Sequence, residues 1–495
     1  MKSCHLLIIA VVAFFFSCNS QKEEKQPEIP SGPIALHPEN PHYFQYKGKT
    51  LALVTSAEHY GAVLNLDFDY KKYLETLEKE GMNYTRIFTG AYFEIFGESF
   101  GIQKNTLAPK KGRVITPWAA WEDNGELLYD LTKWNKAYFE RLKDFMELAR
   151  EKDIIVEVTL FSSIYRDEHW DLSPMNPSNN INIDTPVSRF AAQSDIQTNL
   201  FPFQETFVRK MVTELNQFDN FFFEIQNEPW ADHSVPVYNI VNKEQLKEHD
   251  WQYKADFAAK GAMEWQEKVA STITDEESKL PKKHLIAQNY VNFKASIPEV
   301  KDNISIINFH YAWPEAVEWN YHYNRVLGFD ESGFAGSGDQ VYRRQAWKFM
   351  LSGGGLFNNL DYSFFPGAED GKGENKAPGG GSNELRKQLK TLSDFLHSFE
   401  LEKLIPDYTS VISAPGLIPY VISDPGNAYA IYLRANGTTR SKIEIETGNG
   451  TFRLIYLNTV TGKYSDAGLV TAEDRMITLP IDIPEGELAI KLLKE

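Results

Sequence analysis

Two groups of acidic residues directly follow strand-like apolar runs, where carboxylates can act together. Segment 221–230, FFFEIQNEPW, ends in an Asn-Glu-Pro motif whose acid is Glu228, and segment 327–333, LGFDESG, carries the neighbouring acids Asp330 and Glu331. Hydrolysis of a glycosidic bond needs two carboxyl groups, one to move a proton and one to act at the anomeric carbon. The two segments therefore predict a paired-carboxylate hydrolase.

The second segment offers two acids, whereas the predicted chemistry needs only one. Consecutive side chains of a strand point to opposite faces, so we expect only one of Asp330 and Glu331 to enter the site. Alternation by itself does not choose between them.

The segments that must hold these acids alternate between short apolar runs, typical of buried strands, and stretches with apolar residues at helical spacing. This alternation indicates βαβ units and a parallel sheet. The strand-like runs are 51–55, 83–88, 154–161, 221–226, 284–288, 304–310, 326–330 and 355–362. The helix-like stretches are 70–80, 134–151, 203–218, 245–273, 341–351 and 384–399. Eight strands with helices between them predict a (β/α)8 TIM barrel, whose active groups lie at the C-terminal ends of the strands.

The pattern changes in the last hundred residues to short strands separated by Pro-Gly, Asn-Gly and Thr-Gly turns. These strand-like runs are 411–413, 420–423, 429–434, 442–446, 451–457 and 476–479. Such spacing is typical of an antiparallel β-sandwich. We predict a catalytic barrel at 33–400 and a sandwich domain at 401–495.

The Asn-Glu-Pro motif at the fourth predicted strand and the Glu-x-Gly form of Glu331 at the seventh resemble clan A glycoside hydrolases, which include the cellulase-like family five. The resemblance covers residues 35–400. It implies that Glu228 is the acid/base, that Asn227 contacts the sugar 2-hydroxyl, and that Glu331 rather than Asp330 is the nucleophile of a retaining enzyme. The negative charge of Glu331 would keep Glu228 protonated.

The same resemblance assigns three supporting residues. Arg86 ends the second predicted strand, where the clan keeps an Arg that would hold the nucleophile ionised. His310 and Tyr311 end the sixth, where the clan places a His and a Tyr near the sugar or the nucleophile. Arg86 could instead form a structural salt bridge, and His310 could be an ordinary buried core histidine.

The sequence also departs from the clan, and this leaves the substrate open. The third strand is not followed by the His that is usual in the clan. The eighth strand lacks the Trp on which the sugar stacks, and Asp361 is the candidate for that position. Trp230 and Trp313 lie in predicted loops as possible stacking platforms, although each could simply cover the core. His59, after the first strand, is a candidate contact to a sugar hydroxyl.

The N-terminus has the pattern of an exported protein. Lys2 precedes the apolar run 6–16, which is long enough for a signal peptide and too short to span a bilayer. The following Phe-Phe-Ser-Cys resembles a lipoprotein processing site, so we predict a signal peptide at 1–17, lipidation of Cys18 and a disordered tether at 18–32. The alternative is a plain secretory signal that leaves Cys18 free.

The composition limits the classes of ligand and partner that we expect for this protein. A formal net charge of −17 without a Lys/Arg-rich block argues against nucleic acid, and the aromatic content of 13% suits a carbohydrate ligand. Processing at Cys18 would remove Cys4, the only other cysteine, and leave no disulfide or cysteine metal site. We expect no cofactor and no metal, a monomer, and a lipid-anchored place in the cell envelope as an outer-membrane lipoprotein.

Two other functions fit the same features. A glycan-binding surface lipoprotein could keep the barrel without catalysis, although the presence of both carboxylates argues against it. A barrel hydrolase of another bond, such as an amide, is the second alternative.

Overall fold

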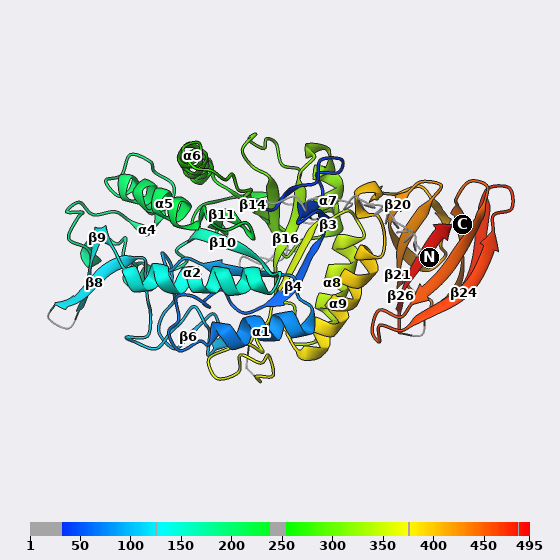
Figure 1. The fold of residues 1–495 in the computed structure, drawn as a ribbon, viewed down its shortest axis with the longest axis horizontal. Coiled ribbons are helices and arrows are strands. Elements are labelled where there is room, and N and C mark those ends of the chain that lie inside the picture. The colour runs from blue at the N-terminus through cyan, green and yellow to red at the C-terminus, as the bar shows by residue number, and fades with distance from the viewer. Residues whose placement is uncertain (1–31, 124–125, 238–253, 375–376, 484) are drawn as a thin grey trace, which may run out of the picture.

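The computed structural model describes residues 32–123, 126–237, 254–374, 377–483 and 485–495. The predicted signal peptide, Cys18 and nearly all of the tether lie outside these ranges. Figure 1 shows a barrel with surrounding helices and an antiparallel β-region at one end. Among the described residues, no helix is both long and apolar enough to cross a membrane.

Eight parallel strands form the barrel and follow one another in chain order around it, which confirms the predicted (β/α)8 fold. They are β4 (Leu53–Ala57), β5 (Tyr84–Phe88), β10 (Ile155–Ser162), β11 (Phe221–Asn227), β14 (Ile286–Asn292), β15 (Ile306–His310), β16 (Val326–Ser332) and β17 (Leu356–Leu360). Every residue of these strands is buried, because helices cover the outer face.

One pair of neighbouring barrel strands is joined by a side chain instead of by backbone hydrogen bonds between the strands. Between β4 and β5 the described backbones form no ladder, and Asn83 connects them instead. Its amide oxygen accepts from Val54 N–H at 2.9 Å, and its amide nitrogen donates to the Ala52 carbonyl at 2.9 Å. The amide side chain thus replaces one backbone pair.

Amphipathic helices cover the barrel, namely α1 (Tyr70–Glu80), α2 (Lys136–Glu151), α5 (Phe201–Leu215), α6 (Lys260–Glu277), α7 (Pro314–Asn320), α8 (Asp339–Met350) and α9 (Asn383–His397). Shorter helices are α3 (Asp167–Trp170) and α4 (Arg189–Ala192). Helix α1 has the predicted bounds because Asp69 caps its first amides and Gly81, at φ 73°, ends it in the left-handed conformation.

The bottom of the barrel is closed by the first described segment. Strands β1 (Ala35–Leu36), β2 (Phe44–Tyr46) and β3 (Lys49–Leu51) form a small antiparallel sheet. Phe44 and Tyr46 pack against residues at the start of the barrel strands, including Tyr84 and Phe222. The open end is therefore the C-terminal end of the strands.

Two local predictions were wrong. The helix predicted at 245–273 begins only at Lys260, because Ala255–Ala258 is strand β13, antiparallel to β12 (Ser234–Val237). Residues 245–253 of that prediction lie outside the described part. The helix predicted from residue 134 starts at Lys136, because Trp134 ends a hairpin of β8 (Trp118–Asp123) and β9 (Glu126–Trp134).

An insert at 89–117, between β5 and the hairpin, covers part of the barrel mouth. It contains the short strands β6 (Glu98–Ser99) and β7 (Ile102–Gln103). Its Tyr92 and Leu107 belong to a separate apolar cluster with Tyr60 and Phe88 of the barrel. This segment was not predicted as a unit.

The C-terminal region is a β-sandwich, as predicted. One sheet has the order β18 (Ile405–Pro406), β20 (Leu417–Asp424), β21 (Ala428–Ala435), β26 (Glu487–Lys494), β23 (Thr451–Leu457), β24 (Tyr464–Thr471). The other consists of β19 (Val411–Ser413), β22 (Arg440–Glu446) and β25 (Met476–Asp482). Strands β18, β24 and β26 were not predicted.

The sandwich shares a core with the barrel. Helices α8 and α9 lie between the two parts in Figure 1, and Trp347 of α8 stacks on Tyr432 of β21 with ring centroids 5.4 Å apart. Glu487, whose side chain is fully buried, accepts from Arg343 at 2.7 Å and Arg344 at 2.9 Å. A buried carboxylate between two guanidinium groups fixes the sandwich to α8.

We expect Glu487→Gln to lower the free energy of unfolding by about 3 kcal/mol, because it leaves buried guanidinium groups without a counter-charge. Urea unfolding followed by tryptophan fluorescence measures the change. The matched control is Glu446→Gln, whose partner Arg475 lies 2.9 Å away on the surface, and which should cost less than about 1 kcal/mol. Equal effects of the two variants would contradict the anchoring role.

Candidate functional site

A cavity lies at the C-terminal ends of the barrel strands and encloses about 420 Å³, part of it open to solvent. Its wall is largely aromatic, with carboxylates between the rings. The lining residues are His59, Tyr60, Phe88, Tyr92, Glu94, Phe100, Ile102, Leu107, Ser162, Tyr165, Asn227, Glu228, Tyr311, Glu331 and Phe334. The two predicted catalytic residues are thus in one cavity.

Glu228 is the first residue after β11. Its backbone is left-handed, with φ 48°, which turns the chain out of the strand. One carboxylate oxygen accepts from the Tyr165 hydroxyl at 2.8 Å, and the other lies 3.0 Å from His310 Nδ1. A non-glycine residue in this conformation is strained, and such strain tends to be kept where function requires the geometry.

Glu331 reaches the same cavity from β16. It accepts from the Tyr311 hydroxyl at 2.8 Å, the Tyr60 hydroxyl at 3.2 Å and Arg86 at 3.3 Å. One oxygen each of Glu228 and Glu331 and a nitrogen of His310 all lie within 4.8 Å of one another. The two carboxylates therefore face each other across a gap that fits one reacting centre.

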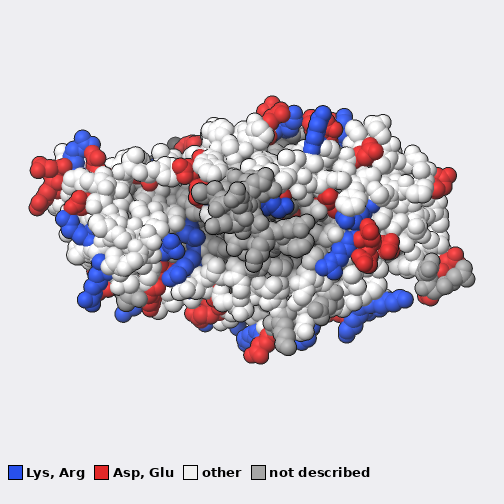
Figure 2. Space-filling view, turned by 180° about the vertical axis from the view of Figure 1, so that it is seen from behind, with Lys and Arg blue, Asp and Glu red and all other residues white. Residues whose placement is uncertain are grey.

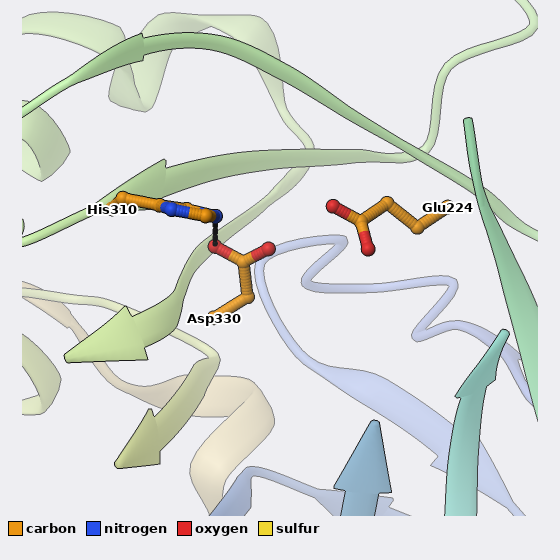
Figure 3. A group of neighbouring side chains, drawn as sticks. All are labelled: Glu224, His310 and Asp330. Carbon is orange, nitrogen blue, oxygen red and sulfur yellow. Dashed lines mark ion pairs between the residues drawn. The ribbon is translucent and has the colours of Figure 1, made fainter. Parts of the chain in front are cut away.

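Of Asp330 and Glu331, only Glu331 lines the cavity, but Asp330 is not turned away from the barrel interior. Phe309 pairs with Phe329, but His310 pairs with Glu331, so β16 carries one extra residue at this point. Such a bulge interrupts the alternation of side chains. Asp330 is therefore also buried inside the barrel, where Figure 3 shows it beside His310, 3.5 Å from the ring nitrogen.

Arg86 is fully buried beneath the cavity. It donates two hydrogen bonds to Glu224, at 2.6 and 2.8 Å, and one to Asn227 at 2.9 Å. Its guanidinium carbon lies 4.6 Å from the centre of the Tyr60 ring. Its strongest partner is thus Glu224, which sequence reasoning had missed, while it also touches Glu331 as expected.

Asn227 links the two sides of the site. Its oxygen accepts from Arg86, and its amide nitrogen donates to the Tyr165 hydroxyl at 2.8 Å and the Ser162 hydroxyl at 3.2 Å. Tyr165 therefore contacts both Asn227 and Glu228. These bonds fix the orientation of the Asn227 amide.

His310 carries the positive charge nearest to Glu228. Burial opposes that charge, but the carboxylates of Glu331 and Asp330 raise the pKa of His310 well above its usual range. Burial alone would raise the pKa of Glu228, yet the hydrogen bond and charge of His310 hold it below its usual range. The charge of His310 thus favours the ionised form of Glu228, against the expectation that the charge of Glu331 keeps it protonated.

The buried acids below the cavity differ in the direction of their pKa shifts. Burial raises the pKa of Asp330, but the charges of His310 and Arg86 outweigh burial and keep it low. Burial raises the pKa of Glu224 in spite of Arg86, and burial with the charges of Glu224 and Asp330 raises that of Glu157 well above its usual range.

Two sets of side chains in this region have the geometry to hold a metal ion, namely Glu228 with His310 and Glu331, and Glu224 with His310 and Asp330. In the second set, Glu224 is already bidentate to Arg86, and Asp330 lies 3.5 Å from the same guanidinium. Arg86 thus supplies there the positive charge that a cation would bring.

The other residues predicted to contact the sugar differ in their position relative to the cavity. His59 lines the cavity, and Trp230 packs edge-on against His310 with centroids 5.3 Å apart, behind the lining residues. Trp313 is 46% exposed outside the cavity, with Lys294 4.1 Å above its ring. Asp361 is buried and bonded to Arg386 at 2.6 Å, which corrects its proposed sugar contact to a structural role.

Sequence reasoning missed several lining residues, including Tyr60, Tyr92, Glu94 and Tyr165. Tyr165 had a usable signal, because it follows the third strand, where the expected His was absent. Glu94 lies in the insert, which has no periodic pattern that predicts its path.

The molecular surface shows no nucleic-acid footprint on the face in Figure 2. Among the described residues of that face, Lys and Arg side chains are interspersed with Asp and Glu and do not gather in one stripe. Among the described residues, the cavity lining likewise contains neither Lys nor Arg.

The fold is shared with solved structures of low sequence identity. A candidate glycoside hydrolase from Bacteroides vulgatus ATCC 8482 is 12% identical, with a TM-score of 0.62 over 94% of this chain and 82% of its own. A glycoside hydrolase family 5 protein from the same organism is 10% identical, with a TM-score of 0.61 over 94% of both chains. A further glycoside hydrolase has a TM-score of 0.57 at 10% identity, over 94% of this chain and 97% of its own.

At these identities the likeness establishes the fold, and its coverage includes both barrel and sandwich. No protein-family model and no curated protein matches the sequence.

We expect His310→Gln to lower the free energy of unfolding most below pH 6.5, by about 3 kcal/mol, because the imidazolium is the buried counter-charge of Glu228 and Asp330. The raised folded-state pKa means that this contribution is complete below the unfolded-state pKa and is lost as pH rises through the folded-state pKa. Urea unfolding from pH 6 to pH 10 measures it, with the exposed His322→Gln as control. A pH-independent loss in His310→Gln would contradict the charge assignment.

Proposed function

We propose that this chain is a retaining glycoside hydrolase that cleaves β-glycosidic bonds of an oligosaccharide or polysaccharide by double displacement. The observation that carries the proposal is the pair of carboxylates in one aromatic-lined cavity, with oxygens of Glu228 and Glu331 within 4.8 Å. Retaining enzymes hold the two carboxyl groups about 5 Å apart, whereas inverting enzymes need about 6.5–9.5 Å to admit a water. The short gap favours retention.

The environments of the two acids suit different roles. Glu331 accepts bonds from two tyrosines and Arg86, which stabilise its ionised form for attack on the anomeric carbon. The bond to the leaving oxygen then breaks, and that oxygen takes the proton held by Glu228 and His310. In the second step Glu228 takes a proton from water, whose oxygen displaces Glu331 and restores the β-configuration.

The shared fold adds support of a coarser kind. The family 5 protein from B. vulgatus has the same barrel and sandwich, and its name gives it as a glycoside hydrolase. Fold likeness does not determine chemistry. The proposal therefore depends on the carboxylate pair.

We further propose that the mature chain is held at the cell envelope through a lipid on Cys18. The support is the sequence pattern alone, a short apolar run followed by Phe-Phe-Ser-Cys and a polar stretch. A monomeric barrel on such a tether would act on glycans near the membrane surface.

We expect Glu331→Gln to lower kcat by at least about 10³-fold on every β-glycoside that the wild type cleaves, because the nucleophile is lost. Glu228→Gln should lower kcat about 10²- to 10⁴-fold on poor leaving groups and far less on nitrophenyl glycosides, which need no protonation. Product NMR should show the β-anomer first.

The matched control is Glu140→Gln on the exposed face of α2, which should keep wild-type activity. An α-anomer as first product would overturn retention. A wild-type protein that binds glycans but is as inactive as both variants would instead be a non-catalytic binder, and cleavage of amides without glycoside cleavage would overturn the sugar chemistry.

For the anchor, we expect the wild type to enter the detergent phase in Triton partition of whole-cell extracts and Cys18→Ser to stay in the aqueous phase. Loss of the thiol removes the only atom that can carry the lipid. The control Cys4→Ser changes the cysteine expected to leave with the signal and should partition like the wild type. Aqueous partition of the wild type itself would exclude the lipid.

A further inference from the structure

The cavity ends in a wall that the barrel alone would not provide. Five lining residues come from the insert at 89–117, namely Tyr92, Glu94, Phe100, Ile102 and Leu107. The insert therefore adds its own side chains to those that the barrel presents to a ligand.

Glu94 is a third carboxylate in this wall, and the mechanism does not use it. It is 2% exposed, and its two oxygens accept from Asn105 at 2.5 Å and from the Tyr92 hydroxyl at 3.3 Å. Its backbone N–H donates to the Leu107 carbonyl at 2.7 Å. A carboxylate held this firmly within a cavity is pre-organised to accept further hydrogen bonds from a ligand.

His59 faces Glu94 with a gap between them. His59 Nε2 lies 3.9 Å from the Glu94 oxygen, too far for a hydrogen bond, and its ring is stacked on Tyr60 with centroids 5.5 Å apart. Its buried Nδ1 has no partner among the described residues. A donor and an acceptor at this separation can each take one of two neighbouring hydroxyl groups.

The position of this pair tells which sugar it would meet. Tyr60 donates to Glu331, so His59 lies on the nucleophile side of the cavity, where the sugar that forms the covalent intermediate must sit. On the other side, Tyr165 and His310 contact Glu228, which protonates the leaving group. The pair of His59 and Glu94 is therefore placed to meet the sugar that becomes bonded to Glu331.

We propose that the insert makes this a site for an uncharged sugar, with Glu94 and His59 as the specificity-determining residues that bind its hydroxyl groups. The inference rests on the proposed function. The described lining residues include three carboxylates and neither Lys nor Arg, and would repel uronic acids and sulfated sugars. Arg86 cannot compensate, because it is buried and already bonded to Glu224, Asn227 and Glu331.

The first experiment compares the cleavage rates of oligosaccharides of four to six units in a neutral and a uronic-acid series. We expect the neutral chains to be cleaved faster. Equal or faster cleavage of the uronic-acid series would overturn the proposal while the hydrolase assignment stands.

The second experiment compares Glu94→Gln and His59→Asn with the wild type on a neutral nitrophenyl glycoside and on its monodeoxy analogues. We expect each variant to lose about 10- to 100-fold in kcat/KM on the full sugar, the value of one charge-assisted hydrogen bond. On the analogue that lacks the recognised hydroxyl, variant and wild type should be nearly equal. The exposed Glu122→Gln on the hairpin is the matched control and should behave as wild type.

Circular dichroism and thermal unfolding identify a variant that fails to fold. If Glu94→Gln fails to fold, the test of the specificity role rests on His59→Asn and on the rates of the wild type with the deoxy analogues. Wild-type rates that no single deoxy substitution lowers, or variants within twofold of wild type on the full sugar, would refute the specificity role alone. A wild type inactive on every glycoside would refute the proposed function and this inference with it.

Discussion

The buried guanidinium of Arg86 is the interaction on which the site depends. A barrel interior normally excludes charge, and an unpaired carboxylate there is costly. Arg86 and His310 are the two cations in contact with the set of buried or nearly buried acids Glu157, Glu224, Glu228, Asp330 and Glu331. Burial and the charges of Glu224 and Asp330 raise the pKa of Glu157 well above its usual range, whereas Glu224 accepts two hydrogen bonds from Arg86.

Different neighbours explain how two carboxylates can differ in role within 4.8 Å. The bonds of Arg86, Tyr60 and Tyr311 all reach Glu331, while Glu228 is bound to His310 and Tyr165. One acid is thus surrounded by tyrosine and guanidinium donors, and the other is paired with an imidazole. The resemblance to known hydrolases had assigned the roles but not this means of separating them.

The barrel was predictable because its strands are continuous apolar runs with turn signals, and the sequence showed where each strand ends. The bulge at Asp330 was not predictable, since one extra residue leaves no mark on hydrophobic periodicity. The partnership of Arg86 with Glu224 was hidden for another reason, because an acid inside a run of phenylalanines carries no sign of its partner. The predicted helix at 245–273 overran β13 because ADFA fits either period.

Chemistry and specificity therefore arise from different parts of the chain. The carboxylates, Arg86 and His310 belong to strands or to the residues directly after them, and these strands are stabilised by the barrel and by α8, to which the sandwich is fixed through Glu487. The wall with Glu94 belongs to an insert that packs through its own apolar cluster. Changes in such an insert can alter which sugar fits without disturbing the charges that cleave the bond, and this is why the sequence indicated the reaction more readily than the substrate.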